Sequence, residues 1–242
     1  DGKKVYGKRK KISSEAQRNY LLIPDSYPLL KQRITLKFKN LDFKETMHLM
    51  GKIGEIKTII GNALSWKPGK LSLAKYGGGP LFHDGTHLTD LLLFFGGPIS
   101  WVSGHETRPG GKKYIEETAS AMLGFSSGAT GFIEGGGARK YFNFELDIQG
   151  SEGRILIGNA GRELYVTKKS TRFTGFQELE KITFPEPKKF ESPFTGGARE
   201  MLMTLRTGKA GVSTGKDGLR ALEVISAIYQ SAQQKGKRVF LT

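Results

Sequence analysis

The chain has 242 residues, contains no cysteine and carries a formal net charge of +15 at pH 7. Without cysteine, disulfides, thiolate catalysis and cysteine-ligated metal sites are excluded. No stretch is apolar over the roughly 18 residues that a membrane-spanning helix needs, so we expect no membrane partner. The positive charge would attract polyanions. It is spread along the chain with one dense cluster within residues 3–11, and no aromatic-basic interleaving of the stacking kind accompanies that cluster, so we do not expect nucleic acid as the partner.

Glycine supplies 33 of the 242 residues, about twice its average share. This abundance indicates many turns and hairpins and favours a β-rich fold. We interpret residues 1–40 as a basic arm or the remnant of another domain, and residues 41–242 as one α+β domain. Along the chain, the pattern of apolar and polar residues predicts a strand at 33–39, then a helix at 42–50 that ends at Gly51, and then a strand at 53–61.

A glycine-rich turn then leads into a helix that carries two of the four histidines, His83 and His87. Residues four apart share a helical face, and Asp90 lies close to it. Three interpretations stay open: a metal site, a structural role for the two histidines, and an acid/base or substrate-binding role. Imidazole suits the last because it titrates near neutral pH.

Strands and turns dominate after Pro98. The predicted strands cover residues 99–105, 118–125, 129–134, 142–149, 154–157, 163–167 and 178–184. A helix at 194–205 follows. Thr214 and Asp217 then form a capping box for a last helix. Its predicted apolar stripe comprises Leu219, Leu222, Ile225, Ile228, Tyr229 and Ala232. The fold class is therefore α+β, a mostly antiparallel sheet with helices packed on one face.

The segment GGGPLFHDGTHLTDLLLFFGGP resembles the signature of the glucose–fructose oxidoreductase / inositol dehydrogenase / rhizopine-catabolism (Gfo/Idh/MocA) family. Residues 51–57 are similar to the strand that leads into the second domain of that family. Residues 214–232 resemble its closing helix. The resemblance covers about residues 40–242. It implies a dihydrodipicolinate-reductase-like C-terminal domain, whose exposed sheet face often forms homo-oligomers.

The family oxidises or reduces a hydroxyl of a sugar, cyclitol or related polyol with NAD or NADP, and we expect a cytoplasmic location. By resemblance, His87 falls on the catalytic or substrate-binding histidine, and His83 falls where many members have Asp. The resemblance thus implies His87 and His83 as catalytic residues. It implies Asp84, Tyr76 and Lys75 as substrate-binding residues, and no metal ligands.

This sequence differs from the family in the motifs that serve the cofactor. It lacks the glycine fingerprint of the family's Rossmann domain and the family's Glu-Lys-Pro motif. We therefore expect that this chain alone does not bind NAD or NADP, and that the Rossmann domain is largely missing. Whether the chain is itself an enzyme stays open. The alternative is a non-catalytic binding or assembly module on the same fold that has lost the cofactor domain.

Overall fold

The computed structural model describes residues 43–65, 78–158, 161–185, 193–209 and 214–241. The expected strand at 33–39, the proposed boundary at residue 40 and the predicted site residues Lys75 and Tyr76 lie outside these ranges.

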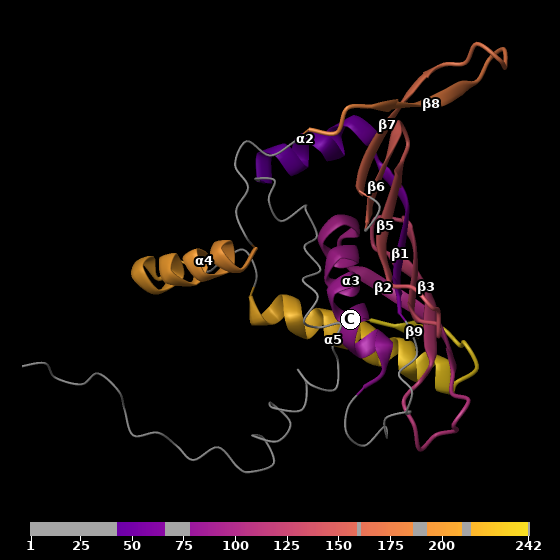
Figure 1. Cartoon of the computed structure of the whole chain (residues 1–242), viewed down its shortest axis with the longest axis vertical. Coiled ribbons are helices and arrows are strands. Elements are labelled where there is room, and N and C mark those ends of the chain that lie inside the picture. Colours follow the sequence, from indigo (N-terminus) through magenta and orange to yellow (C-terminus); the bar gives the residue numbers. More distant parts are fainter. Residues whose placement is uncertain (1–42, 66–77, 159–160, 186–192, 210–213, 242) are drawn as a thin grey trace, which may run out of the picture. The chain divides into compact units, whose positions relative to one another are not determined.

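Helices and strands follow each other largely in the predicted order (Figure 1). The described helices are α2 (Phe43–Ile53), α3 (Pro80–Gly96), α4 (Pro193–Thr207) and α5 (Gly215–Gln233). The strands are β1 (Ile56–Leu64), β2 (Ile99–Thr107), β3 (Thr118–Phe125), β4 (Thr130–Gly136), β5 (Asn143–Gly150), β6 (Gly153–Gly158), β7 (Gly161–Lys169), β8 (Gln177–Ile182) and β9 (Val239–Phe240). None of the described helices is long and apolar enough to cross a membrane.

The strands form one sheet in the order β8-β7-β6-β5-β1-β4-β3-β2-β9. Most neighbours are antiparallel, which confirms the predicted α+β class. The predicted sheet is mostly antiparallel, and the exception is the pair β1 and β4, which is parallel. The reason is the connection through α3. This helix carries the chain from β1 to β2, and β2, β3 and β4 then return as a meander to the edge of β1. Such a crossover makes parallel pairing possible.

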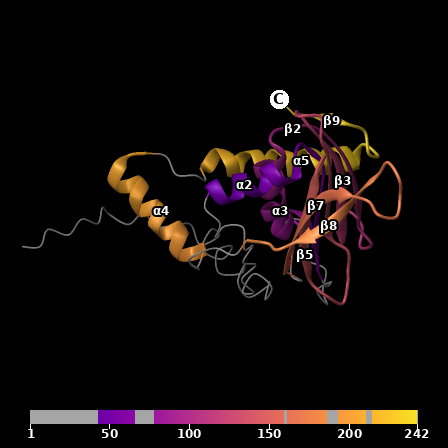
Figure 2. The same cartoon turned by 90° about the horizontal axis from the view of Figure 1, so that it is seen from above.

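Three helices pack on one face of the sheet (Figures 1 and 2). Helix α3 contacts β1, β3 and β4, α5 contacts β2, β9 and α3, and α2 contacts β6 and β7. Glycines on this face let the helices approach closely. A Cβ at Gly61 would lie 2.8 Å from Leu88 Cδ1, and one at Gly104 would lie 2.5 Å from the carbonyl oxygen of Ile228. Part of the glycine abundance therefore reflects helix-to-sheet packing rather than turns.

The end of α2 differs from the prediction. Gly51 lies inside the helix, which continues to the fully buried Ile53. Gly54, with φ of +72°, follows the helix, because glycine adopts the left-handed conformation of a helix C′ position at no steric cost. Burial of Ile53 explains why the helix passes the first glycine. Strand β1 consequently begins three residues later than predicted.

The capping box of α5 is confirmed, but two of the six residues in its predicted apolar stripe are exposed rather than buried. The Asp217 carboxylate accepts hydrogen bonds of 2.8 Å from the backbone N–H and the hydroxyl of Thr214. Leu219 and Leu222 are exposed, at 56% and 38%. The buried side of α5 consists of Ala221, Val224, Ile225, Ala227, Ile228 and Ser231. Small residues at this face let the helix lie close to β2, so periodicity of the large apolar residues misplaced the stripe.

Candidate functional site at the start of helix α3

The first turn of α3 forms without a cap from its own sequence. Gly79 occupies the N-cap position, Pro80 follows it, and this first turn contains no acidic residue. Proline suits this position because its missing N–H would have no helical partner. The carbonyl oxygen of Gly79 accepts hydrogen bonds from the N–H groups of Phe82 (3.0 Å) and His83 (3.1 Å).

The structure places three predicted site residues on the first two turns of α3. Asp84 is buried, with 8% of its surface exposed, His83 is partly buried and His87 is exposed. The Phe82 ring meets the His83 ring edge-to-face, with centroids 6.1 Å apart. The histidines thus lie one helical turn apart, as their spacing predicts, but in different environments.

Burial sets the protonation of His83 and Asp84. It lowers the pKa of His83, against the opposing effects of the Asp84 charge, a hydrogen bond with the Gly78 backbone and the Glu116 charge. Burial raises the pKa of Asp84, against the opposing effects of His83 and His87. Desolvation disfavours a charged side chain in each case. A neutral His83 imidazole can accept a proton, which fits acid/base work on a hydroxyl group.

No group of three or more His, Asp and Glu side chains in the described ranges is arranged to hold a metal ion.

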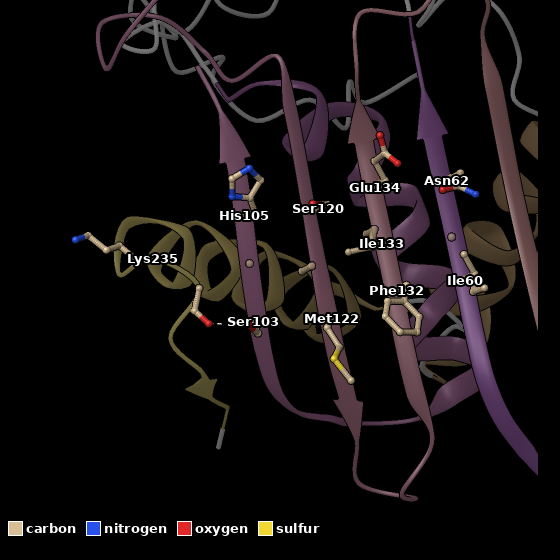
Figure 3. Close-up of a pocket in the computed structure, with 14 residues that line it drawn as sticks. Ile60, Asn62, Ser103, His105, Ser120, Met122, Phe132, Ile133, Glu134 and Lys235 are labelled. Atoms are coloured by element: carbon tan, nitrogen blue, oxygen red, sulfur yellow. Dashed lines mark hydrogen bonds between the residues drawn. The ribbon is translucent and has the colours of Figure 1, made fainter. Parts of the chain in front are cut away.

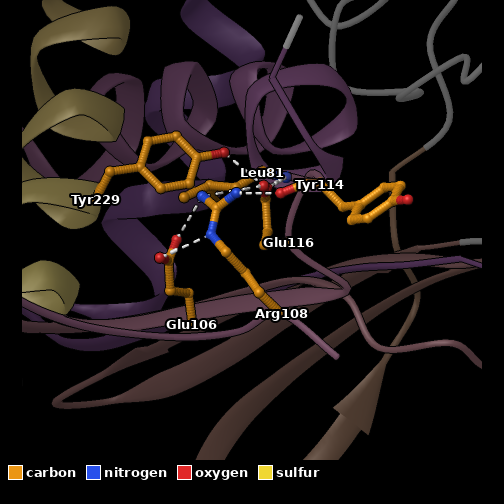
Figure 4. A network of polar contacts seen from close by, with 6 residues as sticks. All are labelled: Leu81, Glu106, Arg108, Tyr114, Glu116 and Tyr229. Atoms are coloured by element: carbon orange, nitrogen blue, oxygen red, sulfur yellow. Dashed lines mark hydrogen bonds and ion pairs between the residues drawn. The ribbon is translucent and has the colours of Figure 1, made fainter. Parts of the chain in front are cut away.

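A buried carboxylate from another part of the chain reaches the first turn of α3 (Figure 4). Glu116, only 2% exposed, precedes β3. Its Oε1 accepts hydrogen bonds from the Leu81 N–H at 3.3 Å and from the Tyr229 hydroxyl at 2.6 Å. Tyr229 comes from α5, so one carboxylate connects α3, α5 and the segment before β3.

Arg108 supports this arrangement from the end of β2 (Figure 4). Its Nε and Nη2 donate hydrogen bonds of 2.8 Å to the two carboxylate oxygens of Glu106, and its Nη1 donates one of 2.7 Å to the Tyr114 carbonyl. Its Nη2 lies 3.8 Å from Glu116 Oε2. Burial, together with the negative charge of Glu116, raises the pKa of the Tyr229 phenol far above its ordinary value.

Sequence reasoning missed Glu116, Arg108 and Tyr229. Tyr229 lies 113 residues after Glu116 along the chain, and carboxylates are usually exposed. Only the glycine preceding Pro80 hinted at a close neighbour, because a Cβ at Gly79 would overlap the Glu116 carboxylate.

The opposite face of the sheet carries a shallow depression of about 490 Å³ (Figure 3). Ile60, Met122 and Phe132 lie in register across β1, β4 and β3 and contribute apolar surface. Asn62, Glu134, Ser120 and His105 form the next cross-strand row. Of the predicted site residues that the structure describes, none lines this depression, so it is a surface separate from the start of α3.

Comparison with known proteins finds one family model and several solved structures that are similar to this domain. Residues 46–156 match the model of the GFO/IDH/MocA C-terminal domain. None of the curated protein sequences matches the chain. Levoglucosan dehydrogenase, solved in complex with NADH, is 21% identical with a TM-score of 0.67, over 84% of this chain and 63% of its own. This chain therefore spans less than two thirds of that protein.

Two further solved structures show the same fold. The WlbA dehydrogenase from Bordetella pertussis, in complex with NADH and UDP-GlcNAcA, is 21% identical with a TM-score of 0.63, over 84% of this chain and 60% of its own. Aldose-aldose oxidoreductase from Caulobacter crescentus, complexed with glycerol, is 22% identical with a TM-score of 0.63, over 81% of this chain and 59% of its own. Residues 46–156 are thus similar to the C-terminal domain of the GFO/IDH/MocA family, in agreement with the resemblance of the signature segment.

Proposed function

We propose that residues 41–242 are the substrate-binding and oligomerisation domain of an NAD(P)-dependent oxidoreductase that acts on a hydroxyl of a sugar, cyclitol or related polyol. The observation that carries this proposal is the grouping of His83, Asp84 and His87 at the start of α3 in a domain of this family. The names of the similar structures support the substrate class, since they include levoglucosan, L-sorbose and glycerol.

Each residue has a distinct role in this proposal. His87, exposed on the helix, meets the substrate hydroxyl and accepts or donates its proton. His83, whose pKa burial lowers, offers a neutral imidazole to the same substrate. Asp84 orients the substrate or the two imidazoles from its buried position. Lys75 and Tyr76 supply hydroxyl contacts from the segment before the helix.

The described residues at the start of α3 do not fit the phosphates of NAD or NADP. A glycine-rich turn that opens a helix can hold a pyrophosphate, because its N–H groups and the helix dipole attract anions. Here the Glu116 carboxylate already accepts the Leu81 N–H, and its charge would repel a phosphate. We therefore place the cofactor away from this turn and assign these residues to the substrate alone.

Calorimetric binding of levoglucosan and L-sorbose to this chain tests the proposal. We expect His87→Ala to weaken binding about tenfold, the equivalent of roughly one hydrogen bond of about 1.4 kcal/mol. His105→Ala is the matched control, because His105 is also exposed but lies on the opposite sheet face. Equal affinity of the His87 variant and the unaltered chain would remove His87 from the site.

A second candidate function, an assembly module, is favoured by the outward face of the sheet. Met122 and Phe132 are 39% and 41% exposed and lie directly opposite each other on β3 and β4. Adjacent exposed apolar side chains are typical of a contact surface. We propose that this face joins two copies of the chain, which is compatible with the substrate role of α3.

A further inference from the structure

Glu116 is an ionisable side chain held almost entirely out of solvent, with 2% of its surface exposed. Burying a carboxylate is costly unless donors or opposite charges compensate for the lost water. Here the compensation comes from the Leu81 N–H, the Tyr229 hydroxyl and the Arg108 guanidinium. A carboxylate kept buried by three separate parts of the chain fixes the geometry of all of them.

The first contact replaces the cap that α3 lacks. The N-cap Gly79 has no side chain to accept a hydrogen bond, and the first turn of this helix contains no acidic residue. The first N–H groups of a helix need acceptors, and a negative charge at this end is favourable. Glu116 satisfies the Leu81 N–H from outside the helix at 3.3 Å. The absence of a Cβ at Gly79 makes room for the carboxylate.

The same turn carries the residues of the proposed site. His83 and Asp84 are two and three residues after Leu81, and His87 is one turn further. The charge of Glu116 also acts on His83, since it opposes the lowering of the His83 pKa by burial. Glu116 thus reaches the site from the sheet side of α3, in addition to its contacts with Arg108 and Tyr229.

We propose that Glu116 is a positioning residue for the substrate site: it fixes the first turn of α3 and with it the orientation in which His83, Asp84 and His87 meet a substrate hydroxyl. This inference rests on the proposed function. It adds a residue that does not touch the substrate and acts through the helix.

The test compares Glu116→Ala and Glu116→Gln with Asp147→Ala in this chain. Asp147 is the matched control because it is also a buried carboxylate, 8% exposed, and its two oxygens accept hydrogen bonds of 2.7 and 2.8 Å from Arg154. It lies on β5, away from α3. Levoglucosan affinity, amide hydrogen exchange of Leu81 and the NMR signals of the His83 ring are measured for each variant.

Positioning predicts a specific pattern. Glu116→Ala should weaken levoglucosan binding at least tenfold, speed exchange of the Leu81 amide at least tenfold and shift the His83 signals. Glu116→Gln keeps an acceptor oxygen and should restore most of the affinity. Asp147→Ala should leave all three readouts unchanged even where it lowers the melting temperature. A role in folding alone would instead lower stability in both Ala variants without changing the folded site.

The failures are distinguishable. If the unaltered chain binds none of the sugars tested, the proposed function fails. Leu81 exchange and the His83 signals then still decide whether Glu116 holds the helix start. If sugar binds and Glu116→Ala keeps the affinity, the Leu81 exchange and the His83 signals, the positioning role is overturned. If Glu116→Ala does not fold, Tyr229→Phe replaces it, because this change removes one hydrogen-bond donor to the Glu116 carboxylate. The positioning role predicts that Tyr229→Phe shifts the NMR signals of His83. Unchanged His83 signals would overturn it.

Discussion

His83 and Asp84 are adjacent side chains whose charged forms are both disfavoured by burial. Burial lowers the pKa of His83 and raises the pKa of Asp84, so each shift favours the uncharged form, and the opposite charges of the two side chains partly counteract both shifts. The pair therefore favours a neutral imidazole next to a carboxyl that is harder to ionise than usual. Such a pairing is well suited to exchanging a proton with an uncharged hydroxyl.

The lowered pKa of His83 predicts a stability change below neutral pH. As the pH falls below the ordinary value of 6.5, the unfolded chain gains a proton that folded His83 resists, so stability decreases toward the lowered folded pKa. Urea unfolding at pH 7.5 and 5.5 should show a smaller loss for His83→Asn than for the unaltered chain. Equal losses would show that His83 is not desolvated.

Asp84 should have the opposite effect on folding stability, at lower pH than His83. Its folded pKa lies above the ordinary 3.8, so protonation below that raised value removes an unfavourable buried charge and favours the folded state. Asp84→Asn, measured beside His83→Asn, separates the two contributions. In Asp84→Asn, this increase in the free energy of unfolding at acidic pH should disappear. If the increase persists, another carboxyl group causes it.

At the scale of elements, the start of α3 depends on the space left by Gly79. A methyl group there would overlap the Glu116 carboxylate, so Gly79→Ala should destabilise the fold by about 1–3 kcal/mol, as overpacked sites do. Gly218→Ala is the control, because a Cβ at Gly218 in α5 meets nothing within 4 Å. It should stabilise the helix by about 0.5–1 kcal/mol. Denaturant midpoints that shift in the same direction in Gly79→Ala and Gly218→Ala would contradict the close approach of the Glu116 carboxylate to Gly79.

The corrected face of α5 gives a second element-scale prediction. Ile228 is fully buried against the sheet, whereas Leu219 is 56% exposed. Ile228→Ala should therefore cost about 2–5 kcal/mol of unfolding free energy, and Leu219→Ala should change it by less than about 0.5 kcal/mol. Guanidinium unfolding measures both. A large loss of unfolding free energy in Leu219→Ala would mean that Leu219 is buried, as the periodicity of the large apolar residues predicted.

Much of the element pattern could be predicted because it is encoded locally. The strand predicted at 142–149 is confirmed as β5, and the Thr214–Asp217 spacing predicted the start of α5. The parallel pairing of β1 with β4 depends on which distant strands meet, so local pattern could not reveal it. Likewise, the spacing of His83 and His87 placed them on one face, but only the tertiary fold brings Glu116 to that helix.

At the scale of the whole molecule, the outward sheet face predicts self-association. Phe132→Glu places a charge among Met122 and Ile60 and should weaken association at least tenfold. Phe176→Glu is the control, because Phe176 is 70% exposed and lies outside that depression. Sedimentation equilibrium at micromolar concentrations reads the mass of each variant. A monomeric unaltered chain, or an unchanged mass for Phe132→Glu, would contradict assembly through this face.

The most direct test of a substrate site at the start of α3 is an NMR titration of the chain with levoglucosan. The ring signals of His83 and His87 and the methyl signals of the sheet-face Met122 are followed together. We predict saturable shifts of both histidines with no change at Met122, and loss of these shifts in His87→Ala. Saturable shifts at Met122 without any at His83 and His87 would place the sugar on the opposite sheet face and contradict a site on α3.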